Sequence, residues 1–249
     1  MQVLKDQGQF EILDYPSDLI RQLIKIERAG RTCYQSCEEV TEDTACAFVR
    51  KIMMRGHESV IEHSSVTVQF NLHSRGMTHE QVRHRLTAIS QESTRYVDYA
   101  KFGDENPDLD KFEIQCVVPP HCDENEEIEV WLPFLNGPAK ITPVQMFECY
   151  EAFYRALRKH GYQPQDARQW LPIGLKSQIV ITANFREWRH IFTMRTGKAA
   201  HWEIRRTMCD LLTEFQKLIP VVFEDFKSGG EDKLGCPFFV KDENHWRNR

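Results

Sequence analysis

The stretch SSVTVQFNL, residues 64–72, carries the clearest secondary-structure signal of the chain. Apolar side chains fall at every second position from Val66 to Leu72, and polar side chains fall between them. A period of two predicts a β-strand with one buried face and one polar face. Further strands are predicted on both sides of it, over residues 9–14, 112–118 and 175–183.

Helical patterns separate these strands. Ser17 is predicted to cap a first helix, whose apolar face carries Ile20, Leu23 and Ile24. Capping patterns, prolines and terminal glycines predict further helices over residues 42–55, 142–160, 164–171, 184–196 and 200–218. Because the strands do not alternate regularly with helices, the pattern favours the α+β class, with an antiparallel or mixed sheet packed with helices.

Length, composition and charge narrow the class of protein. The chain has 249 residues, a formal net charge of −5 and 41% hydrophobic residues. We expect a single domain over residues 1–249, in which the acidic, turn-rich segment 103–141 is a loop or an insertion. The negative charge argues against nucleic acid and acidic membranes as partners. The N-terminus lacks the apolar core of a signal peptide, so we expect a cytoplasmic protein.

The cysteines and histidines do not form a metal-binding pattern. There are eight cysteines but no C-x-x-C, and we expect most of them to be reduced. His57 and Glu58 begin a possible H-E-x-x-H motif, but the motif needs histidine at position 61, which is Ile61. We therefore predict no metal site.

Residues 78–89 have the pattern of a capped amphipathic helix. Thr78 to Gln81 has the spacing of a capping box. Val82, Leu86 and Ile89 would then share one buried stripe.

Positive charge gathers in this region of an otherwise acidic protein. Arg83, His84 and Arg85 would occupy the other faces of the predicted helix, and Ser93 and Arg95 follow in a polar loop. Arginine forks and serine hydroxyls can surround a phosphate. A solvated basic helix face is the common alternative, and composition alone favours it.

The arrangement of this basic segment resembles the signature of the flavin-dependent thymidylate synthases: Arg-His-Arg at 83–85, seven residues, and then Ser93. Three more blocks resemble the family in the same order: GHES with EH at 56–63, DARQWLP at 166–172, and NFREWRHIFTMR at 184–195. The resemblance extends from about residue 10 to 225. Cys33, where many relatives have serine, and Gln91, where many have glutamate, depart from the usual pattern.

The resemblance implies the fold particular to that family and its reaction. The reaction is methylation of dUMP to dTMP, with 5,10-methylenetetrahydrofolate as one-carbon donor and with FAD and NADPH as reductant. No enzyme cysteine acts as the nucleophile in that family. The resemblance also implies a homotetramer whose subunits share the active sites.

It further implies the site residues. The predicted catalytic residue is Arg195, a fixed cation that would stabilise negative charge on the uracil ring. The residues predicted to bind dUMP are Glu80, Gln81, Val82, Arg83, Gln91, Glu92, Ser93, Thr94, Arg95, Arg168 and Arg195. Those predicted to bind FAD are His57, Ser59, Arg83, His84, Arg85, Gln91, Asn184, Phe185, Arg186 and His190.

Three other interpretations remain open at the level of sequence. The chain could be a flavoenzyme that acts on another pyrimidine nucleotide, for example a hydroxymethylase. It could be a catalytically silent nucleotide- or RNA-binding relative, although the net negative charge argues against RNA. It could also be an α+β protein with ordinary surface arginines, which four ordered blocks disfavour.

Overall fold

The computed structural model describes residues 2–33, 35–36, 39–100 and 114–246. The chain divides into two compact units. Unit 1 comprises Met1–Gly8, Asn71–His79 and Gln91–Gln178, and unit 2 comprises Gln9–Phe70, Glu80–Ser90 and Ile179–Arg249. No helix in the described ranges is long and apolar enough to cross a membrane, and the cytoplasmic location remains a prediction.

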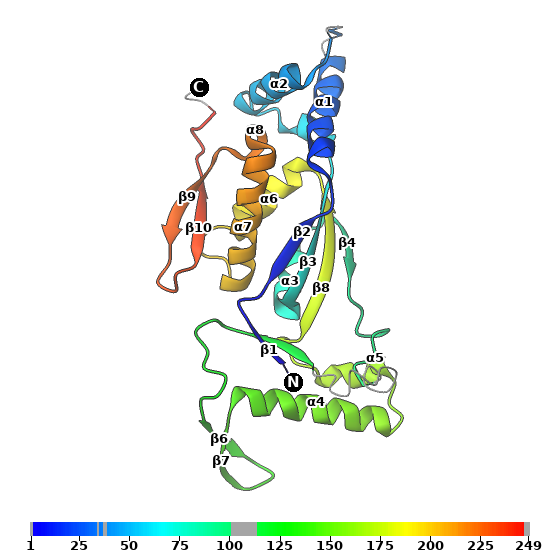
Figure 1. Cartoon of the computed structure of the whole chain (residues 1–249), viewed down its shortest axis with the longest axis vertical. Coiled ribbons are helices and arrows are strands. Elements are labelled where there is room, and N and C mark those ends of the chain that lie inside the picture. The colour runs from blue at the N-terminus through cyan, green and yellow to red at the C-terminus, as the bar shows by residue number, and fades with distance from the viewer. Residues whose placement is uncertain (1, 34, 37–38, 101–113, 247–249) are drawn as a thin grey trace. The chain divides into compact units, whose positions relative to one another are not determined.

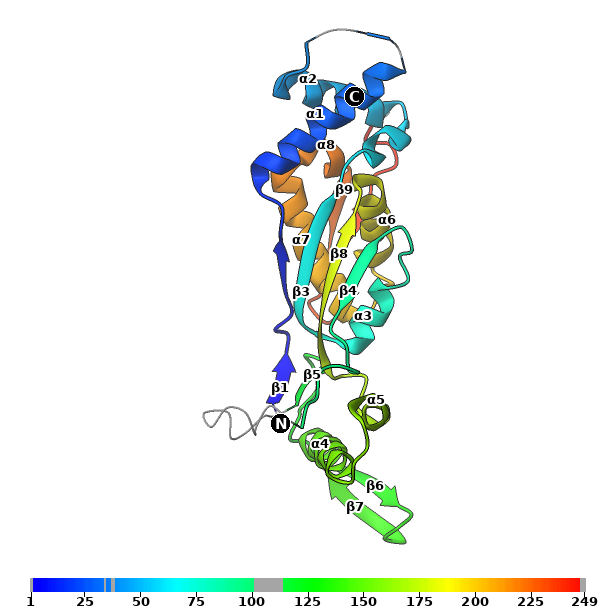
Figure 2. The same ribbon diagram turned by 90° about the vertical axis from the view of Figure 1, so that its right-hand side faces the viewer.

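A four-stranded sheet supplies most of the strands of unit 2, in the order β2-β3-β8-β4. Its strands are β2 (Gln9–Ile12), β3 (Val66–Ser74), β8 (Lys176–Ala183) and β4 (Ala88–Gln91). A hydrogen bond of 2.9 Å between the hydroxyls of Thr67 and Thr182 links β3 to β8. Both strands lie side by side in the two views (Figure 1 and Figure 2).

Helices pack around this sheet within unit 2. They are α1 (Pro16–Thr32), α2 (Glu42–Met54), the 3-10 helix η1 (Glu58–Glu62), α6 (Phe185–Arg195), α7 (Trp202–Leu218) and α8 (Pro220–Phe223). The antiparallel hairpin of β9 (Phe226–Glu231) and β10 (Pro237–Lys241) follows them. Helix α7 lies between β2 and β10 and contacts both (Figure 1).

Aromatic packing fixes the orientation of α6. Trp188 and Phe192 of α6 are fully buried against Phe215 and Phe223, with ring centroids 5.3 Å apart for Phe192 and Phe215. Burying one such side chain contributes about 1.5–3 kcal/mol. The indole N–H of Trp188 donates to the carbonyl oxygen of Val66 over 3.1 Å, which ties α6 to β3. These contacts bury the apolar face of α6 and leave its other face to carry polar side chains.

The start of α6 also matches its prediction. Asn184 is the N-cap residue, and its side-chain oxygen accepts the backbone N–H of Glu187 over 2.8 Å. The cap satisfies one of the N–H groups that have no partner inside a helix. It therefore fixes the register in which Arg186, His190 and Arg195 follow.

Strand β3 forms as predicted, with one exception. Val66, Val68 and Phe70 are fully buried in β3. Leu72 was predicted on the same face, but it has a φ of 60° and is only half-buried. A left-handed residue breaks the alternation of a strand. His73 is buried as a result.

Helix boundaries agree with the sequence except at the first helix and at the helix predicted over 78–89. Helix α1 begins at Pro16 with Tyr15 as its N-cap residue, so the prediction that Ser17 caps it was wrong. Proline is favoured at the first helical position because its φ is already helical. Leu19, Leu23 and Ile26 form the buried stripe. Helix α2 has the capping box of Thr41 and Thr44.

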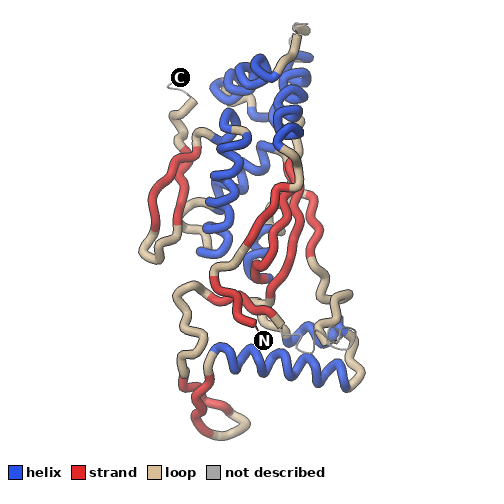
Figure 3. Tube along the Cα trace, in the orientation of Figure 1, coloured by secondary structure: helices blue, strands red, loops and turns tan. Residues whose placement is uncertain are grey.

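Unit 1 has its own core and its own secondary structure. Figure 3 colours the helices and strands of the chain by type. Strands β1 (Gln2–Lys5) and β5 (Gln115–Val118) pair in parallel, and β6 (Ile128–Leu132) and β7 (Gly137–Ile141) form an antiparallel hairpin. The helices are α4 (Pro143–Lys159), α5 (Pro164–Ala167) and the 3-10 helix η3 (Arg168–Trp170). Tyr99, Tyr154 and Leu175 are among the buried residues of its core. Helices and mixed strand pairs together confirm the α+β prediction.

The segment 103–141 contains more regular structure than predicted. Its described part, 114–141, holds β5, which lies within the strand predicted over 112–118, and the β6–β7 hairpin, where a loop was expected. Residues 103–113 lie outside the described residues, and so do the first two residues of the strand predicted over 112–118. Whether the segment is an insertion within a single domain stays a prediction.

The predicted helix over 78–89 is wrong. Helix α3 spans Arg75–Gln81, because the hydroxyl of Ser74 caps the N–H of Met77. Thr78 therefore lies inside the helix, where its hydroxyl donates to the carbonyl of Arg75. Residues after Gln81 turn and enter β4, which pairs with β8. Pairing in the sheet prevails over the helical propensity of this segment.

Candidate active site

The Arg-His-Arg triplet lies in the turn between α3 and β4, beside helix α6. Because the turn has no helical stripe to bury, Val82 and Leu86 are exposed, Leu86 by 76%. Arg83 and Arg85 are also exposed, whereas His84 is buried, with 7% exposure. The turn thus holds one imidazole inside unit 2 and leaves two guanidinium groups in solvent.

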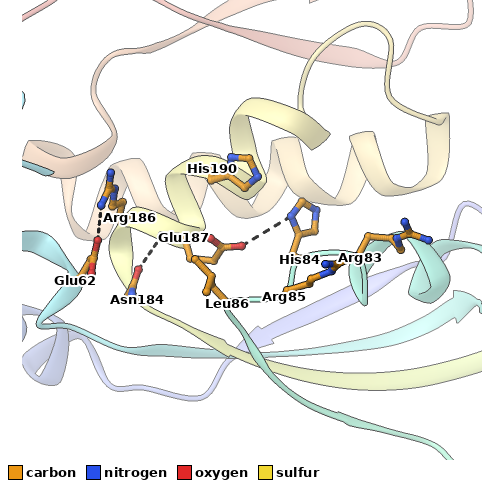
Figure 4. A pocket seen from close by; sticks show the side chains of 9 residues that line it. All are labelled: Glu62, Arg83, His84, Arg85, Leu86, Asn184, Arg186, Glu187 and His190. Atoms are coloured by element: carbon orange, nitrogen blue, oxygen red, sulfur yellow. Dashed lines mark hydrogen bonds and ion pairs between the residues drawn. The ribbon is translucent and has the colours of Figure 1, made fainter. Parts of the chain in front are cut away.

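A pocket of about 710 Å³ opens between this turn and α6 in unit 2 (Figure 4). Its size is within the range of cofactor sites. The lining residues are Glu62, Arg83, His84, Arg85, Leu86, Asn184, Arg186, Glu187 and His190. Six of the predicted FAD-binding residues are therefore brought together here: Arg83, His84, Arg85, Asn184, Arg186 and His190.

The charges of the pocket fit a group with two phosphates. The side chains of Arg83 and Arg85 have no hydrogen bond or ion pair with any residue that the structure describes. Arg186 forms an ion pair with Glu62 (Figure 4). Two unpaired guanidinium groups at an exposed pocket offer planar forks of donors to anionic oxygens. The donor set therefore fits FAD.

Four predicted FAD residues are placed elsewhere. His57 and Ser59 are exposed at the start of η1 and do not line the pocket. The side chain of Phe185 is fully buried in the core, and its backbone N–H donates to Ser64. Gln91 belongs to unit 1, where its side-chain amide donates to the hydroxyl of Thr78 over 2.7 Å.

Arg195, at the end of α6, is held by residues of the α3–β4 segment. Its Nε donates to Nε2 of His84 over 3.0 Å. Its Nη1 donates to Oε2 of Glu80 over 2.7 Å, and its Nη2 donates to the backbone carbonyl of Glu80 over 3.0 Å. The guanidinium is thus fastened through all three nitrogens.

His84 is neutral in this network. Burial in the first place, together with the neighbouring Arg195 and His190, lowers the pKa of its imidazole to about 4. Its Nδ1 lies 4.0 Å from Oε1 of Glu187, whose own pKa is raised by burial. At neutral pH this contact is not an ion pair. His84 therefore cannot supply the positive charge that was expected of it toward a phosphate.

The remaining residues of unit 2 that were predicted to bind dUMP differ in exposure. Val82 is 37% exposed. Gln81 is 1% exposed, and neither atom of its amide has a hydrogen-bond partner among the described residues. A buried amide without partners costs free energy, so this side chain is a candidate for a polar contact that the isolated chain does not provide.

In unit 1 a hydrogen bond links two sequence segments that were predicted to bind dUMP, the one at 91–95 and the one that contains Arg168. Nη1 of Arg168 donates to the hydroxyl of Thr94 over 3.1 Å. Ser93 accepts the backbone N–H of Arg95 over 3.3 Å, and the side chain of Arg95 is exposed. Arg168, Ser93, Thr94 and Arg95 thus form one polar group within this unit.

Glu92 is different, because its carboxylate already has partners. It accepts the hydroxyl of Tyr99 over 2.6 Å and lies 3.2 Å from Nζ of Lys176. The predicted contact of Glu92 with dUMP therefore competes with two interactions of the fold.

The sequence did not indicate Glu62, Glu187 or Lys176 as residues that contact the predicted site residues. Glu187 has the spacing of an ordinary first-turn acid, three residues after Asn184. The partners of the other two, Arg186 and Glu92, are distant in sequence, so no local signal could have identified them.

None of the seven cysteines in the described ranges lines the pocket. Over the same ranges, no three His, Cys, Asp or Glu side chains gather as metal ligands would.

Comparisons with known proteins agree with this picture. The profile of the family described as thymidylate synthase complementing protein matches residues 18–221. A flavin-dependent thymidylate synthase of Mycobacterium avium (strain 104) is 35% identical over 208 residues, which are 81% of this chain and 78% of the relative. Its counterpart in Mycobacterium tuberculosis (strain ATCC 25618 / H37Rv) has the same identity and coverage.

Two solved structures share the fold. The UMP/dUMP methylase PolB from Streptomyces cacaoi, bound with 5-Br UMP, has a TM-score of 0.63 and 21% identity, and the match covers 90% of this chain and 95% of PolB. A thymidylate synthase from Helicobacter pylori, solved with FAD and dUMP, has a TM-score of 0.61 and 20% identity, covering 87% and 98%. At these identities the likeness shows the fold alone.

Proposed function

The chain belongs to the thymidylate synthase complementing protein family, and we propose how its residues divide the work of methylating dUMP to dTMP. It is a flavin-dependent enzyme, and FAD supplies the redox chemistry when bound. Two observations carry the division of roles: two unpaired arginines line the pocket of unit 2, and Arg195 donates to His84, another residue of that pocket.

We propose that Arg83 and Arg85 hold the phosphates of FAD. Their side chains are exposed at the pocket and have no partner in the described part of the chain. His190 is exposed on the α6 side of the same pocket. Arg186 has a lesser role in this proposal, because its pairing with Glu62 already offsets its charge.

Arg195 is proposed as the catalytic residue. An arginine stays protonated in proteins, so it acts as a fixed cation and not as a base. A guanidinium has five N–H donors, of which Arg195 uses three on Glu80 and His84. One N–H on each Nη remains for the uracil ring, where it would stabilise negative charge.

We propose that the polar group of unit 1 contributes to holding dUMP. Arg168 and Arg95 supply positive charge, and the hydroxyls of Ser93 and Thr94 lie beside them. Such a group suits a phosphate monoester. Glu92 is proposed to shape this group through Tyr99 and Lys176.

NADPH is proposed as the reductant and 5,10-methylenetetrahydrofolate as the one-carbon donor. The chemistry of the site supports a route without an enzyme nucleophile, because none of the described cysteines lines the pocket.

A homotetramer with shared sites is also proposed. Unit 1 exposes large apolar side chains on its hairpin, including Trp131 by 64% and Phe134 by 81%. Exposed apolar groups of this size are typical of contact surfaces. Light scattering on the purified protein gives the mass of the assembly: four chains support the proposal, and a monomer contradicts it.

Product formation tests the function. Purified protein is incubated with dUMP, 5,10-methylenetetrahydrofolate and NADPH, with and without added FAD after the flavin has been removed, and dTMP is measured by mass spectrometry. We expect dTMP only with FAD. Parallel incubation with UMP tests the alternative substrate, and methylation of UMP but not dUMP would overturn the assignment of the nucleotide.

A further inference from the structure

Three hydrogen bonds fix the orientation of the Arg195 side chain. Its Nε–H reaches His84, and its two Nη groups reach the carboxylate and the carbonyl of Glu80. The side chain of Arg195 has 18% exposure and that of Glu80 has 30%. An arginine at a helix end would otherwise sample several rotamers, at a cost when it binds a substrate. Here its orientation is set before any ligand arrives.

The proton positions on His84 follow from the same contact. Arginine is always protonated, so its Nε can only donate, and Nε2 of His84 must accept. A histidine that accepts through Nε2 is neutral and carries its proton on Nδ1. That proton faces Glu187, whose Oε1 lies 4.0 Å away. Burial and the neighbouring cations, which lower the pKa of His84, favour the same neutral form.

The imidazole of His84 contacts Arg195 and also lines the pocket. One part of the ring lines the proposed FAD pocket, and His190 of α6 packs edge-on against it with centroids 5.8 Å apart. Its Nε2 contacts the guanidinium of Arg195. A single ring therefore touches both the pocket and the proposed catalytic residue.

We propose that His84 and Glu80 are positioning residues for Arg195, and that neutral His84 aligns the guanidinium from the wall of the cofactor pocket. This inference rests on the proposed function, because it needs Arg195 to act on the nucleotide. It changes the role of both residues: His84 acts through Arg195 instead of as a cation for FAD, and Glu80 acts through Arg195 instead of directly on dUMP.

The first experiment compares two variants at one position. His84→Gln keeps an acceptor near the place of Nε2, whereas His84→Leu removes it. Misplacing a catalytic group by about 1 Å can cost about 10²-fold in rate, so we expect kcat of His84→Leu to fall by about that factor. The KM for dUMP should change much less, and His84→Gln should recover most of the kcat.

The control is His79→Leu, the same substitution at an exposed histidine of α3 that lines no part of the pocket. It should leave kcat unchanged. Flavin absorbance after gel filtration should show FAD retained in all three variants. Unchanged kcat in His84→Leu, or a loss that His84→Gln does not relieve, would overturn the inference.

The second experiment does not depend on activity. Histidines labelled with 13C at the ring Cε1 are followed by NMR in the FAD-loaded full chain, and the signal of His84 is the one missing from His84→Gln. The groups that face it are Arg195, Glu187 and His190 of α6, with Glu80 behind Arg195. We expect His84 to stay neutral from pH 8 to 5.5, whereas an imidazole with the ordinary pKa of about 6.5 would take up a proton in this range.

Failure of the proposed function and failure of the inference about His84 give different results. If wild-type protein makes no dTMP, the proposed function fails, whatever the NMR signal does. If wild-type protein makes dTMP but His84 titrates like an exposed histidine, the contact with Arg195 is not held in solution and the inference fails alone.

Discussion

Lowering the pH should destabilise this protein through His84 in particular. The imidazole has a folded pKa of about 4, against an ordinary value of 6.5. Between these values the unfolded chain binds a proton that the folded chain refuses, so stability falls as the pH falls below about 6.5. At 1.36 kcal/mol for each unit of pKa, moving from pH 8 to pH 5 removes about 2 kcal/mol of folding free energy.

Other groups also titrate in this range, so the assay must isolate His84. Urea unfolding of wild-type protein and of His84→Gln is compared at pH 8 and pH 5, at one protein concentration. Glutamine does not titrate, so the variant should lose about 2 kcal/mol less than wild-type protein between the two pH values. Equal losses in both proteins would mean that His84 is not held neutral in the fold.

Three further predictions concern single residues. Arg195→Lys should lower kcat by about 10²–10³-fold and leave the absorbance of bound flavin unchanged; turnover near the wild-type rate would remove Arg195 from its catalytic role. Gln81→Met should raise the free energy of unfolding in urea titrations by about 1–3 kcal/mol, because both amide atoms are buried without partners among the described residues; a lower free energy of unfolding would show that the amide is satisfied in solution. Gly8→Ala should destabilise unit 1 by about 1–3 kcal/mol, since a Cβ there would collide with the ring of His73; an unchanged midpoint would show that the ring can move aside.

Sequence patterns predicted correctly those strands and helix starts that depend on residues a few positions apart. The alternation from Val66 to Phe70 identified β3, and the side chain of Asn184 identified the start of α6. In each case the residues that carry the signal are within a few positions of one another. A capping box likewise predicted the start of α4, where Thr142 and Gln145 cap each other.

The predicted helix over 78–89 failed for the opposite reason. Its capping box and apolar spacing were real features of the sequence, but Ser74 starts the helix earlier and β8 draws the following residues into the sheet. Neither competitor is visible in the segment itself. The error matters for the site, because a turn and not a helix presents Arg83 and Arg85 at the pocket.

The sequence indicated residues for the candidate site but not the interactions among them. Resemblance to a family indicated Glu80, His84 and Arg195, yet Arg195 lies 115 and 111 residues along the chain from the two others. Nothing in the spacing showed that the three would form one hydrogen-bonded group. The neutral state of His84 likewise depends on burial and on charges that only the fold brings together.

Arg83 and Arg85, the arginines of the α3–β4 turn, are proposed to bind FAD in the pocket of unit 2. The most direct test is an FAD binding isotherm, by flavin fluorescence, on flavin-free wild-type protein and the double variant Arg83→Gln/Arg85→Gln. The matched control is Arg21→Gln/Arg28→Gln, which removes the same charge from the exposed face of α1. Each charge-assisted contact is worth about 1.5–3 kcal/mol, so the double variant should bind FAD at least about 10²-fold more weakly, with the control near wild type. Equal weakening in both double variants, or in neither, would contradict the account.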